Sequence, residues 1–305
     1  MKKNIIALAI ASAFIAPAAM AEAPTVYGSL NLNINATDDK DASVNSTVSR
    51  IGVKGSEDLG DGLKAVYKVE WEMTDVADND GKTPFSARNQ YLGLAGGFGM
   101  VMMGRHDTPF KMSQPSDLFN DGAADLGKFA GDVAVKGGEV RSGDVLAYAS
   151  PSFSGVKIVA AQVMGADEAD TDDATSIAVM YGSTKKGLYA AAAYNFGGMY
   201  DDQEEMRISA QYKADGLTAN IMHQTDANGT GDTLSNTQIN LGYKMGKMMP
   251  KLKYSTADVN GDQESGFAVG LNYSLGKKTT AYIYTVAAED LGVTDATIIG
   301  MNHKF

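Results

Sequence analysis

Charged side chains of opposite sign are the residues of this chain best suited to act on small solutes. The basic ones are Arg50, Lys68, Arg88, Arg105 and Arg141, and the acidic ones are Asp117, Asp121, Asp125 and Asp132. Basic and acidic groups that face each other across a narrow aqueous gap create a transverse electric field, which sets ion preference and favours polar over apolar solutes. The alternative is that they form ordinary surface ion pairs, each worth under ~1 kcal/mol.

The four aspartates lie in a stretch, residues 107–142, that differs from the rest of the chain. It contains Pro109, Pro115 and several glycines, and it has neither the period of a strand nor that of a helix. A segment of this length without secondary structure is usually functional or disordered. We expect it to fold into the bore of a barrel and to narrow it, with the basic side chains on the facing wall. The alternative is a flexible surface loop.

Most of the chain after residue 24 alternates between apolar and polar residues, which is the pattern of β-strands. Leu63, Tyr67 and Trp71 fall on one face of such a segment, for example, and Lys64 and Glu72 fall on the other. A soluble sandwich turns the apolar face inward, whereas a membrane barrel turns it outward. The alternation alone therefore leaves both folds open.

An internal repeat favours the barrel. Aromatic residues stand before short turns, and at the end of the chain, at intervals of 33, 31, 31, 30 and 32 residues: Tyr148, Tyr181, Tyr212, Tyr243, Tyr273 and Phe305. A hairpin of two membrane-spanning strands with its turn and loop has about this length, and aromatic residues at one level form a belt at a membrane interface. The interval from Tyr91 to Tyr148 is 57 residues, so this hairpin holds the extra length of residues 107–142.

The connections between the predicted strands alternate in kind. The short ones lie at 96–97, 151–155, 184–187, 215–216, 246–250 and 276–278, and the longer acidic ones at 38–41, 75–80, 167–173, 201–205 and 258–264. Outer-membrane barrels have short turns at one end and long loops at the other. We count sixteen strands, the second at residues 46–56. The predicted fold class is all-β, a transmembrane antiparallel β-barrel of sixteen strands that is wide enough for an aqueous channel.

The N-terminus predicts export. Two lysines, an apolar run over residues 5–15 and small residues ending at Ala21 indicate a signal peptide over residues 1–21, which leaves residues 22–305 as the barrel domain. A membrane anchor is the weaker alternative, because the apolar run is short. Removal of the two lysines leaves 24 basic and 37 acidic residues, a net charge of −13, which argues against nucleic acid as a partner.

We expect no catalytic residues, no metal site and no cofactor. The chain has no cysteine and three histidines, which argues against zinc. His106 and Asp107 could form half of a hydrolase dyad, but no serine in a G-x-S-x-G setting accompanies them. An outer-membrane barrel enzyme and a soluble exported β-sandwich are the alternatives from other classes.

Several blocks of the sequence resemble the trimeric general porins of Gram-negative outer membranes. They are residues 49–55 with 57–60 and 62–63, residues 88–94 and 99–105, Arg141 with Tyr148, Ser150, Pro151 and Gly155, and the terminal residues 303–305. The resemblance implies that Arg50, Arg88 and Arg141 line the narrowest part of the pore and that the third loop folds inward. It also implies that Phe305 belongs to an assembly signal read by the barrel-insertion machinery.

The predicted function is passive diffusion of ions and small hydrophilic solutes through the outer membrane, with a substrate-selective channel as the alternative. The expected partners are two further copies of the chain in a homotrimer, outer-membrane lipids, lipopolysaccharide and the barrel-assembly machinery. The excess of acidic residues gives a slight expectation of cation preference. The arginines at the constriction oppose it, because distant exposed charges are screened beyond about 8 Å at physiological salt.

Overall fold

The structure is a computed structural model that describes residues 23–37, 40–77, 83–119, 121–129, 139–165, 173–197, 204–227, 233–259 and 261–305. The predicted signal peptide and Asp132 lie outside the described residues. In these ranges no helix is long and apolar enough to cross a membrane.

The described chain is almost entirely made of strands. The first nine are β1 (Thr25–Thr37), β2 (Lys40–Ser46), β3 (Arg50–Gly60), β4 (Leu63–Met73), β5 (Phe85–Gly96), β6 (Gly99–Asp107), β7 (Arg141–Ala149), β8 (Val156–Val163) and β9 (Ala174–Gly182). The others are β10 (Gly187–Phe196), β11 (Glu204–Ala214), β12 (Leu217–Ala227), β13 (Thr233–Tyr243), β14 (Met248–Val259), β15 (Asp262–Ser274), β16 (Thr279–Ala288) and β17 (Val293–Lys304). Two short turns of helix, α2 (Pro109–Met112) and η2 (Glu289–Leu291), interrupt them.

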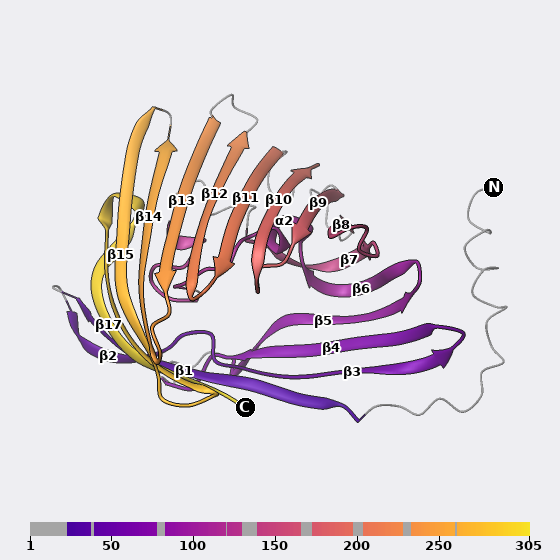
Figure 1. Cartoon of the computed structure of the whole chain (residues 1–305), viewed down its shortest axis with the longest axis horizontal. Coiled ribbons are helices and arrows are strands. Elements are labelled where there is room, and N and C mark those ends of the chain that lie inside the picture. Colours follow the sequence, from indigo (N-terminus) through magenta and orange to yellow (C-terminus); the bar gives the residue numbers. More distant parts are fainter. Residues whose placement is uncertain are drawn as a thin grey trace.

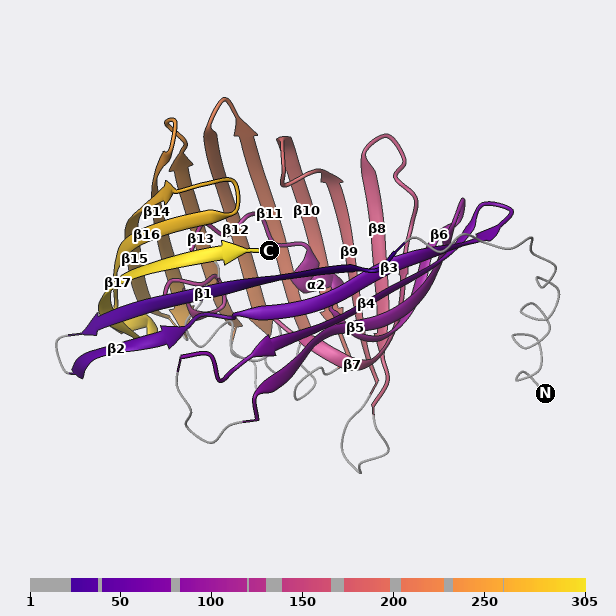
Figure 2. The same ribbon diagram turned by 90° about the horizontal axis from the view of Figure 1, so that it is seen from below.

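The strands form one closed antiparallel barrel. Each strand from β3 onward pairs with the next along the chain, and β17 returns to pair with β1, where Ser29 lies opposite Lys304. Figure 2 shows β1 between β17 on one side and β2 and β3 on the other. Closure removes every free edge. A sheet in lipid requires this because no water is present there to form hydrogen bonds with the unpaired N–H and C=O groups of an edge strand.

The segments β2 and β3 are two halves of one barrel strand. Both pair with β1, β2 along its second half and β3 along its first, so the seventeen segments make the sixteen-stranded barrel that the sequence predicts. The break lies within the predicted strand at 46–56. There Val48 has a φ of 48°, which a β-branched residue rarely adopts. The hydroxyl of Ser49 accepts a hydrogen bond from the Asn31 amide at 3.0 Å and fixes the bend just before Arg50.

Side chains alternate in the sense of a membrane protein. On β13, Gln238 and Asn240 are buried, whereas Ile239 and Leu241 are exposed. The six aromatic residues of the repeat are all exposed, by 40 to 52 %. An apolar exterior over a polar interior is the arrangement of a barrel in lipid, not of a soluble sandwich.

Short connections lie at one end of the barrel, which we call the short-turn end. They follow β3, β5, β7, β9, β11, β13 and β15. One expected long loop differs. Residues 258–264 were predicted as an acidic loop, but β14 continues to Val259 and β15 begins at Asp262, because the two strands pair up to Val259 and Asp262.

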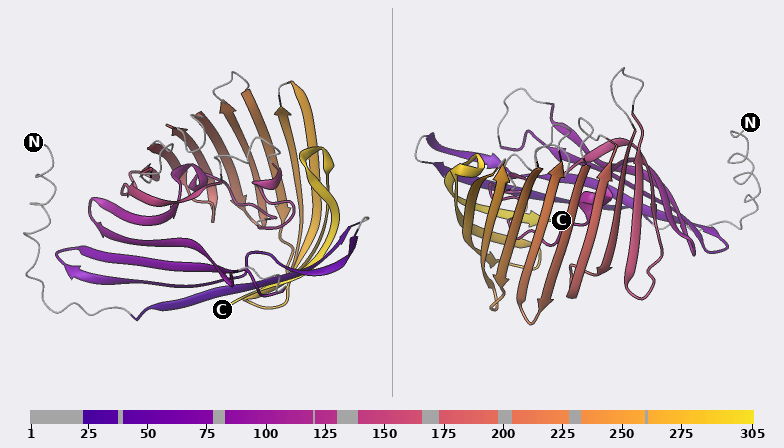
Figure 3. Two further views of the ribbon diagram at one scale, coloured as in Figure 1. Left: turned by 180° about the vertical axis from the view of Figure 1, so that it is seen from behind. Right: turned by 90° about the horizontal axis from the view of Figure 1, so that it is seen from above.

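The described residues of the segment after β6, 108–119 and 121–129, lie inside the ring of strands, which Figures 1 and 3 show from opposite sides. Its apolar side chains Phe110, Phe119, Leu126 and Phe129 are buried. Its backbone is held by polar side chains of the opposite wall. The amide of Gln238 donates to Leu126 O at 2.7 Å, for example.

Candidate functional site

An ion pair joins the β3 side of the barrel wall to the segment after β6. The guanidinium of Arg50, at the start of β3, lies 3.0 Å from the carboxylate of Asp121. Both side chains are partly exposed, Arg50 by 28 % and Asp121 by 20 %. Burial raises the pKa of Asp121 above its ordinary value, and the nearby Arg50 opposes this shift without cancelling it.

The second group of charges is built around Glu70 on β4. Its carboxylate lies 2.9 Å from Arg88 Nε and 3.2 Å from Lys68 Nζ, and it accepts a hydrogen bond from the Tyr27 hydroxyl at 2.8 Å. Glu72, one position farther on the same face, lies 3.6 Å from Arg88. Glu70 is almost fully buried, so its negative charge is directed at the bases and not at water.

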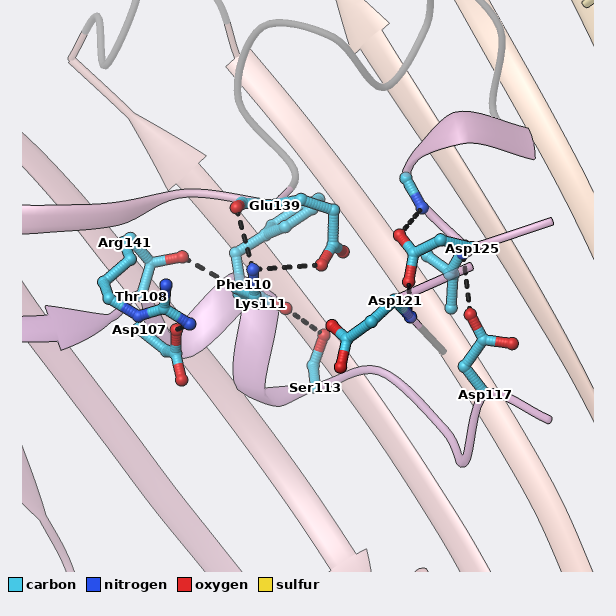
Figure 4. Close-up of polar contacts among 12 residues, drawn as sticks. Asp107, Thr108, Phe110, Lys111, Ser113, Asp117, Asp121, Asp125, Glu139 and Arg141 are labelled. Atoms are coloured by element: carbon cyan, nitrogen blue, oxygen red, sulfur yellow. Dashed lines mark hydrogen bonds and ion pairs between the residues drawn. The ribbon is translucent and has the colours of Figure 1, made fainter. Parts of the chain in front are cut away.

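Arg141 meets its partner where the inner segment begins. The guanidinium lies 2.8 Å from the carboxylate of Asp107 at the end of β6. The Asn89 side chain ties the pair together, because its amide donates to Asp107 at 2.9 Å and its oxygen accepts from Arg141 at 3.1 Å. Figure 4 shows the contact of Asp107 and Arg141 at the start of the segment, away from the aspartates of its far part.

Two of the predicted loop acids hold the segment in place and contact none of the arginines and lysines that the sequence predicts at the constriction. Asp117 is buried against Lys253 Nζ at 2.7 Å and accepts from the backbone amide of Leu126 at 2.7 Å. Asp125 accepts from the backbone amides of Asp121 at 2.8 Å and Gly127 at 3.0 Å. Among the described aspartates of the segment beyond Asp107, only Asp121 contacts a base of the predicted wall.

Arg105 also stands apart from the predicted group. Its strand β6 pairs with β5 in an unbroken register from Gln90 to Gly96, so Arg105 shares a face with Val101 and Met103, which are exposed. Its Nε donates to the backbone oxygen of Ala87 at 3.3 Å. The structure therefore brings together Arg50, Lys68, Arg88 and Arg141 but leaves Arg105 on the outer face.

Phe305 closes the seam between the ends of the chain. Its backbone amide donates to Gly28 O at 3.1 Å, and the Gly28 amide donates to Phe305 O at 3.3 Å. The ring lies directly over Gly28, where a Cβ would come within 2.3 Å of it. The backbone oxygen of Arg50 would lie 2.5 Å from the same Cβ, so a glycine is required at this position.

The sequence reasoning missed the residues that anchor the segment to the opposite wall. They are polar side chains on the inner faces of β11 to β14: Arg207, Gln211, Asn220, Asn236, Gln238, Lys251 and Lys253. The sequence did contain a pattern that could have predicted these anchors. Asn or Gln stands at every second position at Asn236, Gln238 and Asn240, and buried side-chain amides need hydrogen-bond partners.

Among the described residues no group of three His, Asp or Glu side chains could hold a metal ion. His106 contacts the Tyr91 ring, with 5.0 Å between the ring centroids, and its Nδ1 lies 2.7 Å from Asp107 O.

The comparisons with known proteins agree with this architecture. A sequence model of the Gram-negative porins matches residues 7–290. The major outer membrane protein P.IB of Neisseria meningitidis is 26 % identical over 286 residues, which cover 84 % of this chain and 81 % of that protein. The outer membrane porin protein 32 of Delftia acidovorans is 30 % identical over 299 residues, which cover 85 % of this chain and 80 % of that protein.

Solved structures share the fold at lower identity. An anion-selective porin from Comamonas acidovorans superposes with a TM-score of 0.74 at 20 % identity, covering 94 % of this chain and all of that one. The OmpF of Salmonella typhi, in complex with daunomycin, gives a TM-score of 0.75 at 15 % identity over 94 % of this chain and all of that one. A polar-lined barrel with opposed charges inside it and a family match over nearly its whole length lead to one conclusion: this chain belongs to the Gram-negative porin family.

Proposed function

We propose that this porin passes ions and small hydrophilic solutes passively through a constriction between the wall of β3 to β7 and the inner segment. The observation that carries the proposal is the Arg50–Asp121 contact, because it joins the two sides of the lumen at one level. Arg88, Arg141 and Lys68 extend the basic side, and Glu70, Glu72 and Asp107 lie among them.

The charge at this level is balanced. Four bases, Arg50, Lys68, Arg88 and Arg141, stand with four acids, Glu70, Glu72, Asp107 and Asp121, and each base has a carboxylate within 3.2 Å. Ion pairs leave a field across the gap but little net charge within it. We therefore expect the constriction to orient polar solutes strongly and to discriminate weakly between cations and anions.

Assembly and export belong to the same proposal. Residues 1–21 act as a cleaved signal peptide, and the mature chain forms a homotrimer in contact with outer-membrane lipids and lipopolysaccharide. The exposed apolar exterior supports contact with lipid. The terminal strand with Phe305, which must seal against β1, supports recognition by the barrel-insertion machinery.

Single-channel recording tests the proposal. The purified, refolded protein is inserted into a planar bilayer under a salt gradient. We expect large ohmic steps in groups of three and a small reversal potential. An inserted, heat-modifiable barrel without conductance would contradict the proposal, and steps of one unit would contradict the trimer.

A further inference from the structure

A pocket lies beside the Arg50–Asp121 contact, toward the short-turn end. It has a volume of about 340 Å³ and is lined by residues of β1, β3, β14, β15, β16 and β17 and by the inner segment. Arg50 and Asp121 form part of its rim, but Glu70, Arg88 and Arg141 do not line it. The pocket therefore shares the Arg50–Asp121 pair with the constriction and extends from it toward the short-turn end, away from Glu70, Arg88 and Arg141.

The lining of this pocket is basic although the chain as a whole is acidic. Five bases line it, Arg50, Lys251, Lys277, Lys278 and Lys304, and two acids, Asp117 and Asp121. Both acids already have partners, because Asp117 pairs with Lys253 and Asp121 with Arg50. Four lysines remain, and within the part of the chain that the structure describes none of them has a carboxylate at ion-pair distance.

Lys251 is the most informative of the four. Its side chain is only 7 % exposed, and its ammonium donates to the backbone oxygen of Leu118 at 2.7 Å. The rings of Phe119 and Tyr284 lie beside it, at 4.1 and 5.3 Å from Nζ to the ring centroid. An ammonium has three N–H donors, and the hydrogen bond to Leu118 uses one. A charge buried to this degree normally has an anionic partner, and the described chain places no carboxylate within ion-pair distance of Lys251.

The other lysines gather at the mouth of the pocket. Lys277 and Lys278 lie in the turn between β15 and β16. The backbone amide of Lys304, at the end of β17, donates to Lys278 O at 2.9 Å, so this turn and β17 hold like charges side by side. Figure 1 shows this turn beside the C-terminus and β1. Adjacent positive charges repel each other, and a bound anion would relieve this repulsion.

We propose that this pocket is an anion-binding subsite for compact oxyanions with more than one negative charge, such as a phosphate group or a tricarboxylate. Lysine is suited to this task because its ammonium is a compact point charge that binds phosphate well. The volume suits a small ligand, since ligand pockets begin at about 300 Å³. The inference rests on the proposed function in that the ligand reaches the pocket through the lumen.

Isothermal titration calorimetry on the full mature protein in detergent tests the subsite without requiring conduction. The probes are citrate and inorganic phosphate, and their comparison distinguishes carboxylate from phosphate as the preferred group. Lys251→Met removes the buried charge and keeps an unbranched side chain that is one atom shorter. Lys277→Gln with Lys278→Gln removes the mouth charges in an exposed turn. Lys185→Gln with Lys186→Gln is the matched control, because it changes an equivalent pair in the β9–β10 turn at the same end.

We expect saturable binding of at least one probe, weakened about tenfold by Lys251→Met and several-fold by the turn variant, with the control unchanged. Raising the salt to 1 M, where the Debye length falls to about 3 Å, should abolish binding. Absence of binding in the wild type, or equal binding in all variants, would overturn the subsite. If Lys251→Met fails to fold, the turn variant still tests the subsite, because it leaves Lys251 in place. A bilayer without conductance contradicts the proposed function separately.

Discussion

Arg50 and Asp121, 71 residues apart in sequence, meet at 3.0 Å between the wall of the barrel and the segment inside it. The approach depends on local backbone geometry on both sides. Arg50 follows the bend at Val48, and Asp121 itself adopts a φ of 64°. Asn adopts this left-handed region at least as readily as Asp, so the carboxylate can be removed with little disturbance of the backbone.

Asp121→Asn should therefore shift selectivity toward anions. Loss of the carboxylate leaves Arg50 without its partner, and an interaction of ~0.5–1 kcal/mol at a partly exposed site corresponds to a two- to fivefold rise in the anion-to-cation permeability ratio. The measurement is the reversal potential in a tenfold salt gradient. Asp61→Asn is the control, because Asp61 has a φ of 50° but lies in a short turn. An unchanged reversal potential in Asp121→Asn would remove Asp121 from the constriction.

The same residue should make the selectivity depend on pH. Burial raises the pKa of Asp121, so on acidification this carboxylate takes up its proton before ordinary exposed aspartates do. Protonation removes the negative charge that faces Arg50, and the reversal potential should move toward anion preference as the pH falls. Asp121→Asn should lack this component. Identical pH profiles for the wild type and the variant would assign the titration to another group.

Glu70→Gln should have a larger effect than Asp121→Asn, because Glu70 contacts two bases, Arg88 and Lys68. We expect stronger anion preference and earlier unfolding in urea. A double-mutant cycle with Arg88→Gln should give a coupling energy of ~0.5–3 kcal/mol between the two side chains. Glu57→Gln, at an exposed position on β3, provides the control. Additive effects of the two substitutions would show that the pair contributes nothing jointly.

Lys253→Met should loosen the inner segment. Lys253 and Asp117 are 0 and 2 % exposed, and Lys253 also donates to Ala124 O at 2.7 Å. Breaking a buried pair leaves an uncompensated charge and costs ~3–5 kcal/mol. We expect higher single-channel conductance and faster proteolysis at Lys128. Asp117→Asn added to Lys253→Met should restore part of the loss, and Lys244→Gln in an exposed position should change neither property.

Much of the fold follows from the sequence because the barrel obeys a period of two and turns its apolar face to lipid. The alternation at Gln238, Ile239, Asn240 and Leu241 appears unchanged as buried and exposed positions. The repeat of aromatic residues likewise predicts their exposed positions. The same period of two places Arg105 on the outer face with Val101 and Met103. The prediction of Arg105 at the constriction did not follow this alternation.

The partners of the arginines could not be predicted in the same way. Register shifts between Val69 and Trp71 and between Gly104 and His106 place an extra residue in one strand of a pair. Such bulges redirect the side chains next to them, and alternation in the sequence does not reveal them. Arg88 and Arg141 therefore meet Glu70 and Asp107 of the wall, whereas Asp117 and Asp125 of the loop anchor the segment.

The pairing of β1 with β17 has a consequence for the order of events in biogenesis. Residues 29 and 304 are neighbours in the finished sheet, so the seam cannot form until β17 has been synthesised and exported. Until then two edges stand open, and an open edge is not tolerated in hydrocarbon. Contacts between residues so far apart in sequence also form slowly. The complete chain must consequently be kept from aggregating between export and closure, and truncation by even a few terminal residues should convert a folding substrate into one for degradation.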